Sequence, residues 1–239
     1  MSRVISIDNL TLVLLGRTIL DIPQFALEEG DAISLMGPNG AGKSSLLMVM
    51  AALQEPTSGK IYYRDREYPQ CSQLSLHRKM AMVFQKPIML DLSVIENAEL
   101  GLKFRGVPRR QRVARIRPWL EMLGVAHLEK SRARNLSGGE AQRVVLAQSL
   151  VLEPEVIFLD EPFSNLDKEI REELMAQTGK LLKEHKITTV LVTHHSKEAQ
   201  ALSDSVYFLE DGRIVGFEKF RDHGRAYSYE RKGEIGGQT

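Results

Sequence analysis

The sequence is poor in cysteine, in long apolar runs and in excess charge of either sign. Its single cysteine, Cys71, excludes an internal disulfide and a cage of cysteine metal ligands, and it suits a reducing compartment. No apolar stretch approaches the roughly 20 residues that span a bilayer. The run from Leu10 to Leu15 is too short and wrongly flanked for a signal peptide. We therefore expect a cytosolic chain that would reach a membrane only through a partner.

The balance of basic and acidic residues also argues against nucleic acid as a partner. With 32 basic and 31 acidic residues, the net charge is +1 and provides no electrostatic footprint for nucleic acid. Basic residues cluster only between Lys103 and Arg117, where a solvated helix face is favoured over a partner-binding patch. A length of 239 residues allows one large domain or a core with a subdomain.

The most informative stretch that is present is a glycine-rich loop of the form G-x-x-x-x-G-K-[ST]. It reads Gly37, Pro38, Asn39, Gly40, Ala41, Gly42, Lys43 and Ser44, followed by Ser45. Glycines let successive backbone N–H groups turn toward phosphate oxygens, the lysine adds a mobile charge and the serine hydroxyl can ligate Mg²⁺. An apolar run over 32–36 predicts a buried strand before the loop, and 45–53 predicts a buried helix after it. A plain surface turn is the less favoured alternative, so the sequence predicts nucleoside triphosphate binding.

Two acids follow a second buried strand. The run 156–159 is apolar throughout and ends in Asp160 and Glu161. A carboxylate at the end of such a strand lies beside the phosphate loop, where Asp160 can hold Mg²⁺ and Glu161 can polarise an attacking water. A polar loop or a helix start is the alternative reading of this pair.

Further patterns predict an α/β organisation. We expect antiparallel strands at 5–7, 11–15 and 61–63, and a hairpin over 207–217 around Glu210 to Arg213. Helical periodicity covers 112–123, 140–152 and 168–186, and 187–192 reads as another buried strand. Strands that alternate with helices favour a mostly parallel sheet.

A second potential phosphate surface precedes the helical pattern at 140–152. Ser137, Gly138 and Gly139 offer a hydroxyl and free N–H groups at a helix start, although a simple N-cap is an alternative. The stretch from Leu136 to Arg143 resembles the signature of ATP-binding cassette (ABC) ATPases. The resemblance covers roughly residues 5–217, with the motifs in the family's order.

The resemblance implies an ABC ATPase fold, with ATP and Mg²⁺ as cofactors. It combines a P-loop NTPase core of mostly parallel sheet with an antiparallel β subdomain and a helical subdomain. We expect a single ABC domain over 1–239, with the core in 1–85 and 153–222, the helical subdomain in 86–152 and a polar tail in 223–239. The family pairs two cassettes head to tail, which predicts a homodimer.

The resemblance also assigns roles. Glu161, His194 and Gln85 would be catalytic, and Ser44, Gln85 and Asp160 would hold Mg²⁺. Nucleotide contacts would come from the loop Gly37 to Ser45 and from Asp167. Ser137, Gly138 and Gly139 would contact the partner's ATP. The adjacent His195 invites a metal-site reading, but we expect neighbouring strand residues to point to opposite faces.

This sequence departs from the family in two places. The family usually stacks adenine on an aromatic residue just before the glycine equivalent to Gly16, and Leu15 stands there. Apolar contact from Val13 or Leu15, or a ring from elsewhere, would have to replace the stacking. Many importer ATPases also carry a C-terminal regulatory domain, and the end at Thr239 argues against that mode of control.

Among ABC proteins, the segment from Glu96 to Val107 looks like importers of sugars and small inorganic anions. We expect an ATPase subunit that powers import of a small solute, with tungstate or molybdate as the leading cargo. We expect this chain to act at the cytoplasmic face of the membrane, held there by its partner subunits. Its partners would be transmembrane permease subunits and a solute-binding protein, with no nucleic acid. An exporter ATPase and a soluble iron–sulfur assembly ATPase are the alternatives.

Overall fold

The computed structural model describes residues 2–68 and 73–220, which form two compact units. The first unit comprises Met1–Leu76 and Thr188–Thr239, and the second comprises His77–Ile187. Cys71 and the expected polar tail at 223–239 lie outside the described residues. No helix within the described ranges is long and apolar enough to cross a bilayer.

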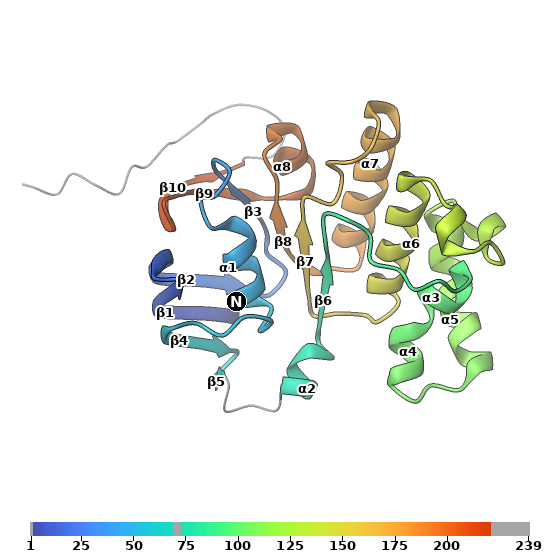
Figure 1. Cartoon of the computed structure of the whole chain (residues 1–239), viewed down its shortest axis with the longest axis horizontal. Coiled ribbons are helices and arrows are strands. Elements are labelled where there is room, and N and C mark those ends of the chain that lie inside the picture. Colours follow the sequence, from blue (N-terminus) through green and yellow to red (C-terminus); the bar gives the residue numbers. More distant parts are fainter. Residues whose placement is uncertain (1, 69–72, 221–239) are drawn as a thin grey trace, which may run out of the picture. The chain divides into compact units, whose positions relative to one another are not determined.

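An antiparallel sheet forms part of the first unit, as predicted (Figure 1). Its strands are β1 (Arg3–Leu14), β2 (Arg17–Glu28), β4 (Ser58–Tyr63) and β5 (Arg66–Tyr68), in the order β2-β1-β4-β5. The two strands expected at 5–7 and 11–15 are one continuous strand. Asn9, at a φ of 48°, accompanies a register shift against β4 between Asp8 and Thr11, which interrupts the alternation of buried residues.

The first unit also contains four strands in the order β10-β9-β3-β8. They are β3 (Ala32–Met36), β8 (Thr188–Val192), β9 (Ser205–Glu210) and β10 (Arg213–Lys219). β3 pairs in parallel with β8 and β9, and the predicted hairpin joins β9 antiparallel to β10. All of β8 is buried, because α1 (Lys43–Met50) packs against it, and α8 (Ser196–Leu202) packs against β3.

The second unit combines a parallel strand pair with a group of helices. Strands β6 (Met80–Val83) and β7 (Val156–Asp160) are parallel. The helices of this unit are α3 (Val94–Ala98), α4 (Leu100–Phe104), α5 (Arg109–Met122), α6 (Gly138–Leu150) and α7 (Lys168–Glu184), with short 3₁₀ turns at Ala126–Leu128 and Ala133–Asn135. α6 is buried on most of its surface because α3, α5, α7 and β6 all pack against it. A short helix, α2 (Gln73–His77), lies where the two units meet in the sequence.

Several helix boundaries differ from those predicted, and α1 and α6 each begin two residues earlier than predicted, at Lys43 and Gly138. α5 begins at Arg109 rather than 112, because Pro108, at a φ of −59°, occupies its N-cap position, and the helix carries Pro118 inside it. α7 ends at Glu184, and Lys186 adopts the left-handed conformation at a φ of 51° that closes many helices. The predicted helical subdomain at 86–152 falls within the second unit, and the finer subdivision stays a prediction.

Candidate nucleotide site

The glycine-rich loop begins where β3 ends, in the first unit. A Cβ atom on Gly37 would lie 2.0 Å from the carbonyl oxygen of Leu209, so no larger residue fits there. Gly42 has a φ of 96°, and a Cβ there would lie 2.8 Å from the carbonyl oxygen of Ile19. Close packing of backbone on backbone therefore requires both glycines.

Lys43 is buried and closes this loop on itself. Its Nζ donates hydrogen bonds of 2.9 Å to the carbonyl oxygens of Gly37 and Pro38. Ser44 follows on the exposed side of the first turn of α1. That turn has no acidic residue, and its N-cap, Gly42, provides no side-chain hydrogen bond. Its N–H groups, together with the lysine charge, suit an anion such as phosphate.

The segment that carries Thr193 and His194 lies beside this loop in the same unit. Leu35 of β3 is in register with Val192 of β8, and the Thr193 N–H donates to the Leu35 carbonyl oxygen at 3.3 Å. The glycine-rich loop and Thr193-His194 therefore leave the carboxyl ends of adjacent parallel strands, where such sheets place their ligands.

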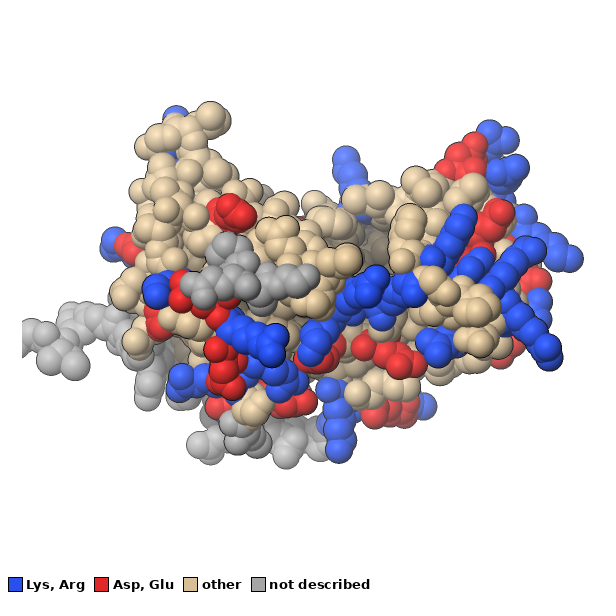
Figure 2. Space-filling view, turned by 90° about the horizontal axis from the view of Figure 1, so that it is seen from below, with Lys and Arg blue, Asp and Glu red and all other residues tan. Residues whose placement is uncertain are grey.

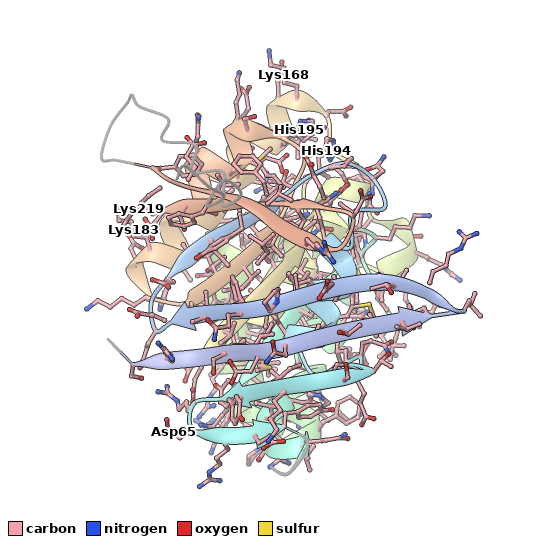
Figure 3. The ribbon with its side chains drawn as sticks, turned by 90° about the vertical axis from the view of Figure 1, so that its left-hand side faces the viewer. Asp65, Lys168, Lys183, His194, His195 and Lys219 are labelled. Atoms are coloured by element: carbon pink, nitrogen blue, oxygen red, sulfur yellow. The ribbon has the colours of Figure 1, made fainter. Side chains whose placement is uncertain are left out.

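His194 and His195 are not on opposite faces of a strand, contrary to the prediction. Both follow the end of β8, and their rings lie side by side with centroids 4.0 Å apart (Figure 3). Strand alternation does not apply because the chain has already left the sheet. Among the described residues, no group of three or more His, Cys, Asp or Glu side chains is arranged to hold a metal ion.

A buried brace that the sequence analysis did not single out holds the histidine segment. The Thr193 hydroxyl donates to Glu198 Oε2 at 2.5 Å and accepts from the His195 N–H at 3.0 Å. Thr193 and Glu198 are 1% and 2% exposed. In sequence, Glu198 resembles an ordinary acid in the first turn of a helix, and only packing reveals that it is buried.

The second unit brings together Gln85, Asp160 and Glu161. Val83 and Leu159 are in register on the parallel strands β6 and β7, so the residues that follow them are neighbours. Gln85 Nε2 donates to Glu161 Oε2 at 3.1 Å and to the Ser164 hydroxyl at 3.3 Å.

The backbone at Glu161 is unusual for a bulky residue. It has a φ of 45°, which surrounding contacts must hold in place, since this conformation costs energy outside glycine. One of these contacts is from the Ser164 hydroxyl to the Glu161 carbonyl oxygen, at 3.0 Å. Asp160 ends β7 and is partly buried. The hydroxyl, amide and carboxylate oxygens of Ser44, Gln85 and Asp160 are the oxygen donors that Mg²⁺ prefers.

Ser137 is the N-cap of α6, so the N-cap that the sequence analysis gave as an alternative is present in the structure. The Glu140 carboxylate accepts from the Ser137 N–H at 2.7 Å and from its hydroxyl at 2.8 Å, completing a capping box. These two hydrogen bonds hold the pKa of the Glu140 carboxyl below its usual value, so Glu140 is charged at neutral pH. A Cβ on Gly139 would lie 3.0 Å from Ile170 of α7, which places this helix start near Asp167, the N-cap of α7.

The predicted site residues thus form separate groups within each unit. The glycine-rich loop and His194 lie together in the first unit. Gln85, Asp160 and Glu161 lie together in the second unit, which also carries Ser137, Gly138, Gly139 and Asp167. The roles assigned to these residues stay predictions.

The turn that carries Leu15 has a strained backbone. Leu15 and Gly16 join β1 to β2 with φ values of 50° and 75°, as in a type I′ hairpin turn. Asparagine or glycine would favour this conformation, and a leucine there costs energy. The Leu15 side chain is fully exposed. Further along β2, Ile19 and Leu20 pack on Gly42 of the glycine-rich loop.

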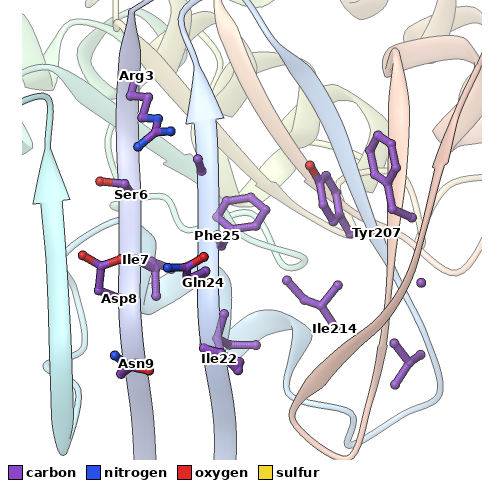
Figure 4. A pocket seen from close by; sticks show the side chains of 15 residues that line it. Arg3, Ser6, Ile7, Asp8, Asn9, Ile22, Gln24, Phe25, Tyr207 and Ile214 are labelled. Atoms are coloured by element: carbon purple, nitrogen blue, oxygen red, sulfur yellow. The ribbon is translucent and has the colours of Figure 1, made fainter. Parts of the chain in front are cut away.

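A separate cleft of about 1010 Å³ lies in the first unit (Figure 4). It is lined by parts of β1, β2, β9 and β10 and contains an aromatic cluster. The rings of Phe25 and Tyr207 are 5.2 Å apart, and those of Tyr207 and Phe217 are 4.8 Å apart. Burial raises the pKa of the Tyr207 hydroxyl. None of the predicted site residues lines this cleft.

Comparisons with known proteins agree with these motifs. A model of the family described as "ABC transporter" matches residues 20–164. The tungstate uptake system ATP-binding protein TupC of Peptoclostridium acidaminophilum is 34% identical over 210 residues, which cover 88% of this chain and 96% of that protein. The molybdate/tungstate import ATP-binding protein WtpC of Thermococcus kodakarensis is 38% identical over 192 residues, covering 80% of this chain and 58% of that protein.

An iron importer protein and a solved structure are also similar. The Fe(3+) ions import ATP-binding protein FbpC of Escherichia coli is 34% identical over 212 residues, covering 88% of this chain and 60% of that protein. This chain therefore spans less than two thirds of WtpC and FbpC. The dimeric ATP-binding cassette MJ0796, in a post-hydrolysis state bound to ADP and Pi, superposes with a TM-score of 0.82 at 30% identity. The match covers 91% of this chain and 99% of that one.

Proposed function

This chain belongs to the ABC transporter family as an ATP-binding ATPase of the importer type, and we propose that it powers import of a small inorganic oxyanion, tungstate or molybdate. The similarity to TupC carries this proposal, because it extends over 96% of that protein. Two of the three relatives described above are named for tungstate or molybdate, and these are anions of the same shape.

ATP hydrolysis would need residues from both groups, the one with the glycine-rich loop and His194 and the one with Gln85, Asp160 and Glu161. The glycine-rich loop and Lys43 would bind the phosphates. Glu161 would take a proton from a water whose oxygen attacks the γ-phosphorus, and the bond to the bridging oxygen would break to release ADP and phosphate. Gln85, already hydrogen-bonded to Glu161, would orient that water, and His194 would contact the γ-phosphate. Mg²⁺, held by Ser44, Gln85 and Asp160, would neutralise the phosphate charge.

A head-to-tail homodimer would complete each site. The start of α6, with Ser137, Gly138 and Gly139, would meet the γ-phosphate of the partner's ATP, and Asp167 would lie at the same interface. The ADP- and Pi-bound cassette MJ0796, which is dimeric, supports this arrangement. ATP would hold the dimer closed, and loss of the γ-phosphate would let it open. Because ATP would bind the closed dimer more tightly than the open one, each cycle of hydrolysis could move a membrane partner between two conformations.

At the cytoplasmic face of the membrane, this chain would pass the motion to transmembrane permease subunits, and a solute-binding protein would be the third component of the system. Within the second unit, the segment after Gln85 exposes apolar side chains that suit such docking. Ile88, Leu90 and Phe104 are 66%, 53% and 77% exposed.

Reconstitution of this chain with candidate permease subunits and a candidate solute-binding protein tests the proposal. ATP hydrolysis in proteoliposomes should rise when loaded binding protein is added with tungstate or molybdate. Sulfate and Fe³⁺ serve as comparison solutes. Stimulation by Fe³⁺ alone would overturn the oxyanion assignment. Stimulation without a binding protein, with solute leaving the ATP side, would identify an exporter instead.

Replacing Leu15 with tyrosine should tighten ATP binding by about fivefold or more, because stacking on a nucleobase contributes roughly 1–3 kcal/mol. Equilibrium titration with ATP and GTP measures the change. Leu15→Asn is the matched control, since it relieves the strained turn without adding a ring. The control should raise the melting temperature and leave ATP affinity no tighter. Equal affinity of Leu15→Tyr and the unmodified protein would show that the base does not contact this turn.

Replacing Glu140 with glutamine should strengthen ATP-dependent dimerisation about three- to tenfold at low salt. The glutamine oxygen can still accept from Ser137, but the negative charge beside the proposed phosphate contacts is gone, and opposing like charges weaken association. The dimer dissociation constant, measured in the Glu161→Gln background, reports the effect. Glu172→Gln on α7 makes the same charge change elsewhere. An equal effect of both substitutions would attribute the gain to net charge alone.

A further inference from the structure

The basic segment from Lys103 to Arg117 has more charge than the fold uses. It contains seven Lys and Arg residues, and no Asp or Glu lies between Leu100 and Leu120. Three of the seven cations have partners. Arg105 donates to the carbonyl oxygens of Leu152 and Arg78, Arg112 forms a largely buried ion pair with Glu99, and Arg117 pairs with Glu129. These contacts tie α4 and α5 to their surroundings.

The other four cations project into solvent. Lys103, Arg109, Arg110 and Arg115 are exposed, and none makes a hydrogen bond or ion pair within the described part of the chain. Figure 2 shows Lys and Arg side chains gathered at the end of the molecule that carries α4 and α5. The first turn of α5 has no acidic residue, so its dipole adds to the positive field of Arg109 and Arg110 instead of being neutralised.

Part of this positive charge lines a shallow groove on the surface of α5. Arg109, Arg110 and Arg117 surround a floor of Val113 and Ala114 on α5, enclosing about 480 Å³. Guanidinium groups match phosphate oxygens in pairs of hydrogen bonds, and the small apolar floor suits the glycerol and upper acyl carbons of a lipid.

We propose that the α5 patch, formed by Arg109, Arg110 and Arg117 around Val113 and Ala114, binds the phosphate headgroups of an anionic membrane surface. The inference rests on the proposed transport function, which brings the chain to a membrane. A permease loop suits the patch less well, because cytoplasmic loops of membrane proteins are themselves rich in Lys and Arg and would repel it. Anionic headgroups have the complementary charge, and several clustered cations suffice for attraction.

Vesicle co-sedimentation of the purified chain tests this directly. We expect binding to phosphatidylcholine vesicles that contain about 30% phosphatidylglycerol, little binding to pure phosphatidylcholine, and loss of binding at high salt. The triple variant R109Q/R110Q/R117Q, which removes the three arginines that line the groove, should bind at least about tenfold more weakly. The matched control K180Q/K183Q/K186Q removes three exposed lysines at and just beyond the end of α7 in the same unit, and it should bind like the unmodified chain.

Several outcomes would overturn the proposal. One is equal loss in both triple variants, which would reflect net charge rather than this patch. Another is a patch variant that keeps vesicle binding but no longer co-purifies with the permease subunits, which would make α5 a protein-docking surface. Melting temperature and ATP affinity of each variant, measured in parallel, show that the fold persists. A chain that binds vesicles but hydrolyses no ATP would refute the proposed function and leave the lipid inference standing.

Discussion

Replacing Glu161 with glutamine should slow ATP hydrolysis by at least about a hundredfold, because the proposed general base can no longer take a proton from the attacking water. ATP affinity should remain, since the proposed phosphate contacts lie on the glycine-rich loop and not on Glu161. The glutamine is close in size to Glu161 and keeps an oxygen that can accept from Gln85, whose Nε2 lies 3.1 Å from the Glu161 carboxylate. Steady-state hydrolysis and equilibrium ATP titration separate the two quantities.

The same variant should accumulate as an ATP-bound dimer. Without hydrolysis, the γ-phosphates continue to bridge the two cassettes, so ATP should convert monomer to dimer in gel filtration with light scattering. ADP should not. Glu172→Gln, an exposed acid on α7, is the matched control and should hydrolyse ATP normally. Unimpaired turnover of Glu161→Gln would remove Glu161 from the reaction. Tight ATP binding without any dimer would show that closure needs the membrane partner.

Replacing Lys43 with alanine should weaken ATP binding by about a hundredfold or more, because hydrogen bonds to charged groups contribute roughly 1.5–3 kcal/mol each and the lysine can reach more than one phosphate oxygen. Lys43 is 7% exposed, and its Nζ donates to two carbonyl oxygens of its own loop. It would exchange these contacts for phosphate when nucleotide binds. Isothermal titration with ATP measures the loss.

A structural role for Lys43 must be separated from a binding role. Removing the amine leaves two loop carbonyls without their donor, so the variant could lose affinity through a distorted loop. The melting temperature of Lys43→Ala reports such damage, and Lys43→Arg retains a charged donor. We expect Lys43→Arg to recover part of the affinity, and Lys60→Ala, at an exposed lysine of β4, to change nothing. Retained affinity in Lys43→Ala would refute the phosphate-loop assignment.

Local patterns predicted the elements that depend on short stretches of chain. The strand at 32–36 matches β3, and the hairpin around Glu210 to Arg213 matches β9 and β10. Asp211 and Gly212, at φ values of 46° and 78°, explain the hairpin, since this turn needs residues that tolerate positive φ. β2 escaped prediction because Pro23 interrupts its pattern, although the structure accommodates the proline on an exposed position of the strand.

For the candidate site, too, some features were predicted from the sequence and others became visible only in the structure. Spacing alone identified the glycine-rich loop, Asp160 and Glu161, because each chemistry needs particular residues at fixed offsets. Spacing did not reveal that Glu161 adopts positive φ, that Gln85 donates to its carboxylate, or that Glu198 and Thr193 form a buried pair. It also led to the wrong arrangement of His194 and His195, because a strand was assumed to continue past its end.

The sequence by itself determined the family of this protein, because a glycine-rich loop, a carboxylate pair and a second glycine-rich helix start occur in the order of an ABC ATPase. Only the tertiary structure decided which side chains meet. Gln85 and Glu161 are 76 positions apart, and Leu35 and Val192 are in register although most of the chain lies between them. Such contacts arise because parallel strands align their carboxyl ends, and that alignment depends on the packing of the whole sheet rather than on any local run of residues.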